Sequence, residues 1–178
     1  MIQYWKSKQE RISKMTLAEQ KGETLKKGEY YFGDICYIMN NEVYSQVWGN
    51  QYKYENGIFN VDFTDSKGKR WIGTFAVAGT AYGDGCYDGL HRDYPVDAGV
   101  LGLVPRSLWD PEKVNDIKRL GHRFVSKSEV KFYFSEGYFE VFDGKTIEKV
   151  NTDDTEYPYD TEDAEDTEDA EDAEDMDN

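Results

Sequence analysis

Residues 58–78 read IFNVDFTDSKGKRWIGTFAVA, and this stretch decides the predicted fold. Apolar side chains stand at positions 59, 61 and 63, and this period of two places them on one face of a strand. Residues 65–68 (DSKG) combine turn-forming residues, and 71–78 is a second run rich in β-formers. The stretch therefore predicts two strands joined by a tight turn.

The neighbouring residues extend this pattern in both directions. Asn56-Gly57 favours a type I′ turn, so residues 51–54 are predicted to pair with 58–64 and complete a β-meander. Asp110 is a candidate N-cap and Gly121 a candidate terminator for a helix over 110–121. Residues 43–48 suit either a helix or a strand. Further strands are predicted at 30–32, 35–39, 100–104, 130–134, 138–142 and 146–150.

About eight short strands and one helix predict a β-rich α+β fold. We expect an antiparallel sheet that forms a small barrel or sandwich, closed by the helix at about 110–121. The predicted domains are a polar, mildly basic N-terminal arm (1–28), a compact β-rich domain (29–150) and an acidic, low-complexity tail (151–178).

Charge is concentrated in the tail. Of the 36 acidic residues, 15 lie in 151–178, which has no Lys or Arg; the other 21 balance the 21 bases of residues 1–150. Repeats of DTEDAE place like charges at helical spacing, so we predict that the tail is disordered. It is expected to repel nucleic acid and anionic membranes and to attract a basic protein surface or the basic arm. The alternatives are a solubilising repeat without a partner and weak binding of divalent cations.

The chain carries no signal that predicts export or membrane insertion. Its apolar runs fall short of the roughly 20 residues that span a bilayer, and its N-terminus lacks the apolar core of a signal peptide. We therefore predict an intracellular, cytoplasmic protein with no transmembrane segment, whose two cysteines are thiols.

Both cysteines lie in a six-residue pattern that occurs twice. Residues 32–37 read FGDICY, and residues 82–87 read YGDGCY. In one interpretation each Gly-Asp makes an independent turn into a strand. In the other the two strands lie side by side and bring the cysteines together as a thiol pair, a disulfide or part of a divalent-metal site. The candidate ligands are Asp34, Cys36, Asp84, Cys86 and His91.

Residues 79–105 hold six glycines and four aspartates, an unusual density. We predict that 79–97 is a binding loop, because functional groups tend to lie on loops held by a rigid scaffold. The plain alternative is a polar surface loop whose aspartates cap turns. The predicted contact residues are Tyr82, Asp84, Tyr87, Asp88, His91, Asp93 and Asp97.

The same loop suggests an enzymatic alternative. Aspartates near a histidine can hold a hard cation or act as general acids and bases. This would make the chain a small metal-assisted hydrolase centred on Asp84, Asp88, His91, Asp97 and Cys86, with Cys86, His91 and Asp84 as catalytic residues. A chain with two histidines offers few general bases, so we favour a non-enzymatic protein with no cofactor.

Three segments together carry a resemblance. Residues 33–37 (GDICY), 82–87 (YGDGCY) and 96–105 (VDAGVLGLVP) resemble sequences in small, mostly uncharacterised proteins of phages, large DNA viruses and some bacteria. The likeness covers about residues 29–150. It brings no activity to carry over, and it implies an intracellular accessory protein, with a viral origin as an open alternative. The sequence thus predicts a binding protein that uses loop 79–97, with the tail tuning contact to a basic partner.

Overall fold

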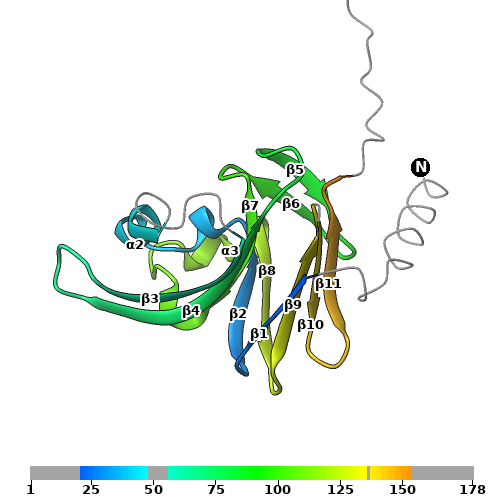
Figure 1. Ribbon diagram of the computed structural model, residues 1–178. Helices are drawn as coiled ribbons and strands as arrows, with labels where there is room; N and C mark the ends of the chain where they lie inside the picture. Colours follow the sequence, from blue (N-terminus) through cyan, green and yellow to red (C-terminus); the bar gives the residue numbers. More distant parts are fainter. Residues whose placement is uncertain (1–20, 48–55, 136, 154–178) are drawn as a thin grey trace, which may run out of the picture.

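The computed structural model describes residues 21–47, 56–135 and 137–153, and over these ranges the chain is built mainly from antiparallel strands (Figure 1). One sheet has four strands in the order β1-β9-β10-β11, a second has five in the order β3-β4-β7-β2-β8, and β5 pairs with β6. The predicted β-rich, antiparallel fold is confirmed. The strands are β1 (Lys21–Leu25), β2 (Gly28–Gly33), β3 (Gly57–Thr64), β4 (Arg70–Gly79), β5 (Gly85–Asp88), β6 (Asp93–Val96), β7 (Val100–Pro105), β8 (Gly121–Ser126), β9 (Val130–Ser135), β10 (Tyr138–Phe142) and β11 (Thr146–Asn151).

The predicted hairpin at 58–78 is confirmed as β3 and β4, which pair from Gly57↔Val77 to Thr64↔Arg70. Asp65 organises the turn: its Oδ1 accepts hydrogen bonds from the backbone N–H groups of Lys67 and Lys69, and its Oδ2 accepts one from Trp71 Nε1. A carboxylate that binds several N–H donors stabilises such a turn strongly.

The predicted turn at Asn56-Gly57 is described only in part, because residues 48–55 lie outside the described residues. Gly57 is the first residue of β3, and the Asn56 side chain accepts a hydrogen bond from Gly79 N at the end of β4. The strand predicted at 51–54 lies outside the described residues.

The strand predicted at 35–39 is wrong. Residues Ile35–Tyr37 form a 3₁₀ helix, because Asp34 caps it by accepting a hydrogen bond from Cys36 N. Of the ambiguous stretch 43–48, residues 43–46 lie in the helix α2 (Asn41–Gln46), which is capped by Asn40. The predicted helix at 110–121 is confirmed only over its later residues. A 3₁₀ turn covers Val114–Asp116, and the helix α3 covers Ile117–Leu120.

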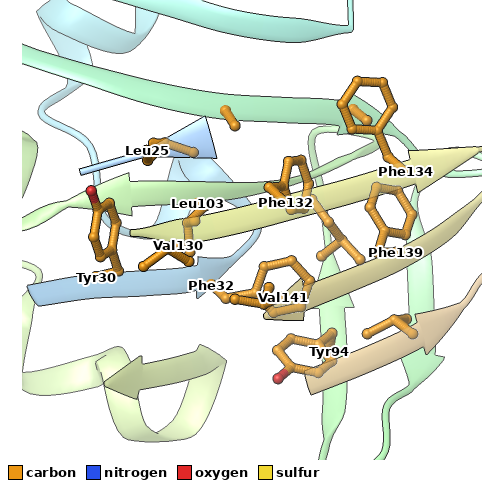
Figure 2. Close-up of a cluster of buried hydrophobic side chains, with 14 of the residues drawn as sticks. Leu25, Tyr30, Phe32, Tyr94, Leu103, Val130, Phe132, Phe134, Phe139 and Val141 are labelled. Atoms are coloured by element: carbon orange, nitrogen blue, oxygen red, sulfur yellow. The ribbon is translucent and has the colours of Figure 1, made fainter. Parts of the chain in front are cut away.

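The centre of the five-stranded sheet is buried on both faces. In β2, Tyr30 and Phe32 join a core against the four-stranded sheet, whereas Tyr31 joins a second core beneath the helices. Figure 2 shows the first core, where Phe132, Phe139 and Val141 of the smaller sheet pack against Phe32. The molecule is therefore a sandwich with a helical layer outside the larger sheet (Figure 1).

The central strand β7 requires a glycine at position 102. A Cβ on Gly102 would lie 2.5 Å from Ile35 Cγ2 and 2.7 Å from the backbone oxygen of Ala76. We expect Gly102→Ala to lower the free energy of unfolding by about 2 kcal/mol, because the clash is partly with backbone. Urea unfolding measures this value, with Gly79→Ala as the control, since a Cβ there meets nothing closer than 3.8 Å. Equal stability of the two variants would contradict this packing.

Two stretches assigned to the arm and the tail take part in the fold. Lys21–Leu25 form β1, which pairs with β9. At the other end Thr152 is buried, and its N–H and hydroxyl both donate to Gly137 O. The predicted disorder of the remaining tail concerns residues outside the described part of the chain.

Candidate functional site

The two copies of the repeated motif fold differently. Asp34 begins a 3₁₀ helix, whereas Asp84 precedes the strand β5. Cys36 is half-buried and Cys86 is exposed, and the two do not form a disulfide with each other. Within the described ranges, no three or more His, Cys, Asp and Glu side chains gather closely enough to hold a metal ion. The thiol-pair and metal-site interpretations therefore gain no support from the arrangement.

The two motif aspartates nevertheless approach the same segment, residues 97–99. Asp34 Oδ2 accepts hydrogen bonds of 2.7 Å from both Asp97 N and Ala98 N. A Cβ built on Gly99 would lie 3.8 Å from Asp84 Oδ1. This shared segment leads directly into β7, so the motif helps to position the central strand.

The chemistry around Asp34 is that of a structural support. Burial raises the pKa of Asp34, and hydrogen bonds from the backbone N–H groups of Cys36, Ala98 and Asp97 oppose that rise. Burial and the nearby Asp34 charge raise the pKa of the Cys36 thiol far above its ordinary value. The thiol therefore stays protonated at neutral pH, which makes Cys36 a poor nucleophile.

Lys113 completes this support. Its Nζ donates hydrogen bonds to Cys36 O at 2.9 Å, Met39 O at 2.6 Å and Asn41 Oδ1 at 2.8 Å. Burial lowers the pKa of Lys113. The ammonium group thus satisfies carbonyl groups between the 3₁₀ helix and α2, and it ties the helical layer together.

Glu148 is a second buried carboxylate, and the sequence analysis did not identify it. Its Oε2 accepts a 2.7 Å hydrogen bond from the Tyr94 hydroxyl, and its Oε1 accepts bonds from Leu90 N at 2.6 Å and His91 N at 3.2 Å. His122 Nδ1 lies 3.8 Å from Oε2, an ion-pair distance. Glu148 therefore fastens the connection between β5 and β6 to β11.

The charged form of Glu148 is favoured in the folded protein. Burial raises its pKa, but His122, the Tyr94 hydroxyl and the Lys149 N–H together outweigh burial and lower the pKa below the ordinary value of 4.5. One signal in the sequence pointed to this residue: Glu148 lies two positions before the buried Val150 in β11, on a core-facing position.

Arg92 fixes the same connection from its other side. Its guanidinium donates hydrogen bonds to the carbonyl oxygens of Lys118, Arg119 and Gly121, where α3 ends and β8 begins. Cations at the carboxyl end of a helix are favourable because the last carbonyl groups lack partners. The C-terminal half of the predicted loop is therefore held in place by hydrogen bonds to Glu148 and to the end of α3.

The predicted contact residues occupy different environments. Tyr87 is buried, and its hydroxyl donates to Gly83 O. Asp88 and Asp93 face each other across the β5–β6 ladder, and His91 is exposed while its N–H donates to Glu148. Tyr82, Asp84 and Asp97 are exposed, and the Tyr82 side chain is the most open of the aromatic ones described, at 60%. Whether these residues bind a partner stays a prediction.

The N-terminal part of the loop meets the start of the tail. Ala81 N donates a 2.8 Å hydrogen bond to Thr152 Oγ1, across 71 positions of sequence. Tyr82 donates through its hydroxyl to Asp153 Oδ1 at 3.3 Å. The exposed part of the loop and the first residues of the tail therefore form one continuous surface.

A hollow of about 470 Å³ lies at this junction. Its lining includes the apolar residues Ala78, Phe134 and Phe139, which are almost fully buried, and the polar residues Thr80 and Asp153. The lining residues are Asn56, Ala78, Gly79, Thr80, Ala81, Phe134, Ser135, Gly137, Phe139 and Asp153. We call this feature the junction hollow.

Comparisons with known proteins returned no match: no protein-family model, no curated protein and no solved structure is similar to this chain. The resemblance to phage and viral proteins stays a prediction. Among the described residues, no helix has the length and apolar character to cross a membrane.

Proposed function

We propose that this protein is a non-enzymatic binding protein that contacts a basic protein partner through loop 79–97 and the acidic tail. The observation that carries the proposal is the junction between the two: Ala81 N binds Thr152 Oγ1, and Tyr82 binds Asp153. The described part of the chain therefore ends, at Asp153, beside the exposed half of the loop. A partner that contacts one is within reach of the other.

Charge and exposure support a basic partner. The sequence places 14 acidic residues after Asp153 and no Lys or Arg, and the surface where this segment begins exposes Tyr82. Tyrosine supplies a large amphipathic contact area at low entropic cost. The tail attracts the partner over a distance, and the loop adds short-range contacts.

The hydrolase alternative has no specific observation in its favour. The backbone N–H of His91 donates a hydrogen bond to Glu148, whereas the backbone N–H of Asp97 donates one to Asp34. Cys86 and Asp84 are exposed near the start of β5. His91 lies in the connection of the β5–β6 hairpin, whereas Asp84 and Asp97 lie at its other end.

Removal of the tail tests its part in binding. The chain should end at Asp153, because Thr152 and Asp153 contact the loop and Gly137. For a Gly-Lys repeat peptide at low salt, we expect about tenfold weaker binding by this shortened chain than by the full chain. Fluorescence anisotropy gives both affinities, and thermal melting confirms that the shortened chain is folded.

Salt provides the control for this comparison. The advantage of the full chain should fall as the salt concentration rises, because exposed charges separated by more than about 10 Å are screened at 0.1 M. Equal affinities of the two chains at low salt would remove the tail from the proposed function.

A further inference from the structure

The junction hollow combines apolar and acidic residues in its lining. Phe134, Phe139 and Ala78 are almost fully buried, and they come from both large sheets. Asp153 and the polar Asn56 and Thr80 lie around them. None of the lining residues is Lys or Arg. A ligand for this hollow needs an apolar stem and a positive or hydrogen-bond-donating end.

Acidic groups also lie around the hollow. Glu23 Oε1 would be 3.8 Å from a Cβ on Gly57, the residue that follows the lining residue Asn56. Asp153 carries the chain onward into the acidic tail. Asp153 in the lining and Glu23 near Gly57 are thus two described carboxylates in this region, and their negative charge favours a cation over an anion.

We propose that the junction hollow receives a single lysine or arginine side chain from a basic segment of the partner; this inference rests on the proposed function. The methylene stem contacts the accessible lining residues Thr80 and Ala81, because Phe134 and Phe139 are almost fully buried, and the charged end reaches Asp153. Lys and Arg side chains pack in this way, with the stem on apolar surface and the head in a polar environment. The volume is at the lower end of the ~300–1,000 Å³ of small-ligand sites, which suits one long side chain.

A second source of the same side chain lies in this protein. Residues 1–20 contain Lys6, Lys8, Arg11 and Lys14, and the segment joins β1 at Lys21, which pairs with the lining residue Phe134. We assign the hollow to the partner because the junction also exposes Tyr82, which offers further contact area to a separate chain. Occupation by the protein's own residues 1–20 is an outcome that the test distinguishes.

The test uses the full chain and two peptides of equal charge. One is a Gly-Lys repeat, and the other replaces each lysine by 2,3-diaminopropionic acid, which has an amino group on a stem shorter by three methylenes. Binding is measured at about pH 5, where the amino groups of both peptides are protonated and the carboxylates of the tail are mostly ionised. The tail attracts both peptides by charge, whereas the hollow favours the longer stem. We expect the lysine peptide to bind about fivefold more tightly, since each buried methylene contributes about 0.8 kcal/mol and burial is partial.

Two variants and one control variant test whether the hollow causes this preference for the lysine peptide. Ala81→Leu fills the hollow from an exposed position, and Asp153→Asn removes the charge at its edge. Both are expected to abolish the fivefold preference. Glu129→Gln changes the net charge by the same amount at an exposed site outside the lining, and it should keep the preference.

The outcomes separate this inference from the proposed function. Binding of both peptides with equal affinity would overturn the hollow as a side-chain receptor while leaving the tail's attraction intact. Binding of neither peptide would overturn both proposals. A preference that appears only after residues 1–20 are deleted would assign the hollow to the protein's own arm and overturn its assignment to the partner.

Discussion

Replacing Glu148 by alanine is expected to lower the free energy of unfolding by about 3 kcal/mol or more, because the change removes a buried, charged acceptor. The Tyr94 hydroxyl and His91 N–H would lose their partner inside the protein. The connection between β5 and β6 would lose its side-chain link to β11, whereas the backbone bond from Leu90 N to Lys149 O would remain. Urea unfolding gives the overall loss, and amide hydrogen exchange at His91 reports the local release.

Glu148→Gln provides the matched variant, because it keeps the side-chain size and removes the charge. The folded-state pKa of Glu148 is lower than 4.5, so the carboxylate contributes stability above the unfolded pKa. This contribution is lost as the pH falls through the folded pKa. The stability difference between wild type and Glu148→Gln should therefore be constant near neutral pH and shrink below about pH 4.5. A difference that grows in acid would contradict this account of Glu148.

Asp34→Ala is the second change with a large expected effect, about 3 kcal/mol. Asp34 is fully buried and accepts hydrogen bonds from Cys36 N, Asp97 N and Ala98 N. Its loss leaves three backbone donors without an acceptor and frees the segment that leads into β7. Urea or thermal unfolding measures the change.

The second copy of the motif supplies the control for Asp34. Asp84 occupies the equivalent place in the sequence, but its side chain is exposed. We expect Asp84→Ala to change stability by no more than about 0.5 kcal/mol. Similar losses at the two positions would mean that the copies share a structural role, and this would contradict the difference in their folds.

The sequence predicted best where strand periodicity and a turn agreed. The alternation at 59, 61 and 63 and the turn at Asp65 correctly predicted β3 and β4, because one face of β3 is buried and the turn residues are satisfied locally. The unbroken apolar run of β7 was also correctly predicted as a buried strand, since both faces of its sheet are covered.

The errors came where distant contacts outweigh local preference. The motif around Asp34 was expected to lead into a strand, but Asp34 caps a 3₁₀ helix and binds residues 97–98 instead. Gly121 ends α3 as predicted, yet its backbone is extended, and a Cβ there would clash with the Tyr31 ring and lie 2.6 Å from Phe32 O. A single sequence carries no record of such long-range packing.

The candidate site was predicted only in part. Residues 79–97 were recognised by their composition, but the contact between Ala81 and Thr152 spans 71 positions and has no local signal. Glu148 was missed although its spacing of two from Val150 in β11 is a local signal of a core-facing position. A glutamate in a short strand is usually exposed, and its burial became visible only once Tyr94 and the 90–91 backbone were placed around it.

Backbone amide chemical shifts of the isotope-labelled full chain, recorded during titration with the Gly-Lys repeat peptide, test the central claim most directly. The claim is that the loop, the start of the tail and the junction hollow form one binding surface for a basic partner. It predicts concerted shifts at Gly79, Ala81, Gly137 and Asp153, together with shifts in the tail. Shifts confined to residues 154–178, with none around the hollow, would contradict it.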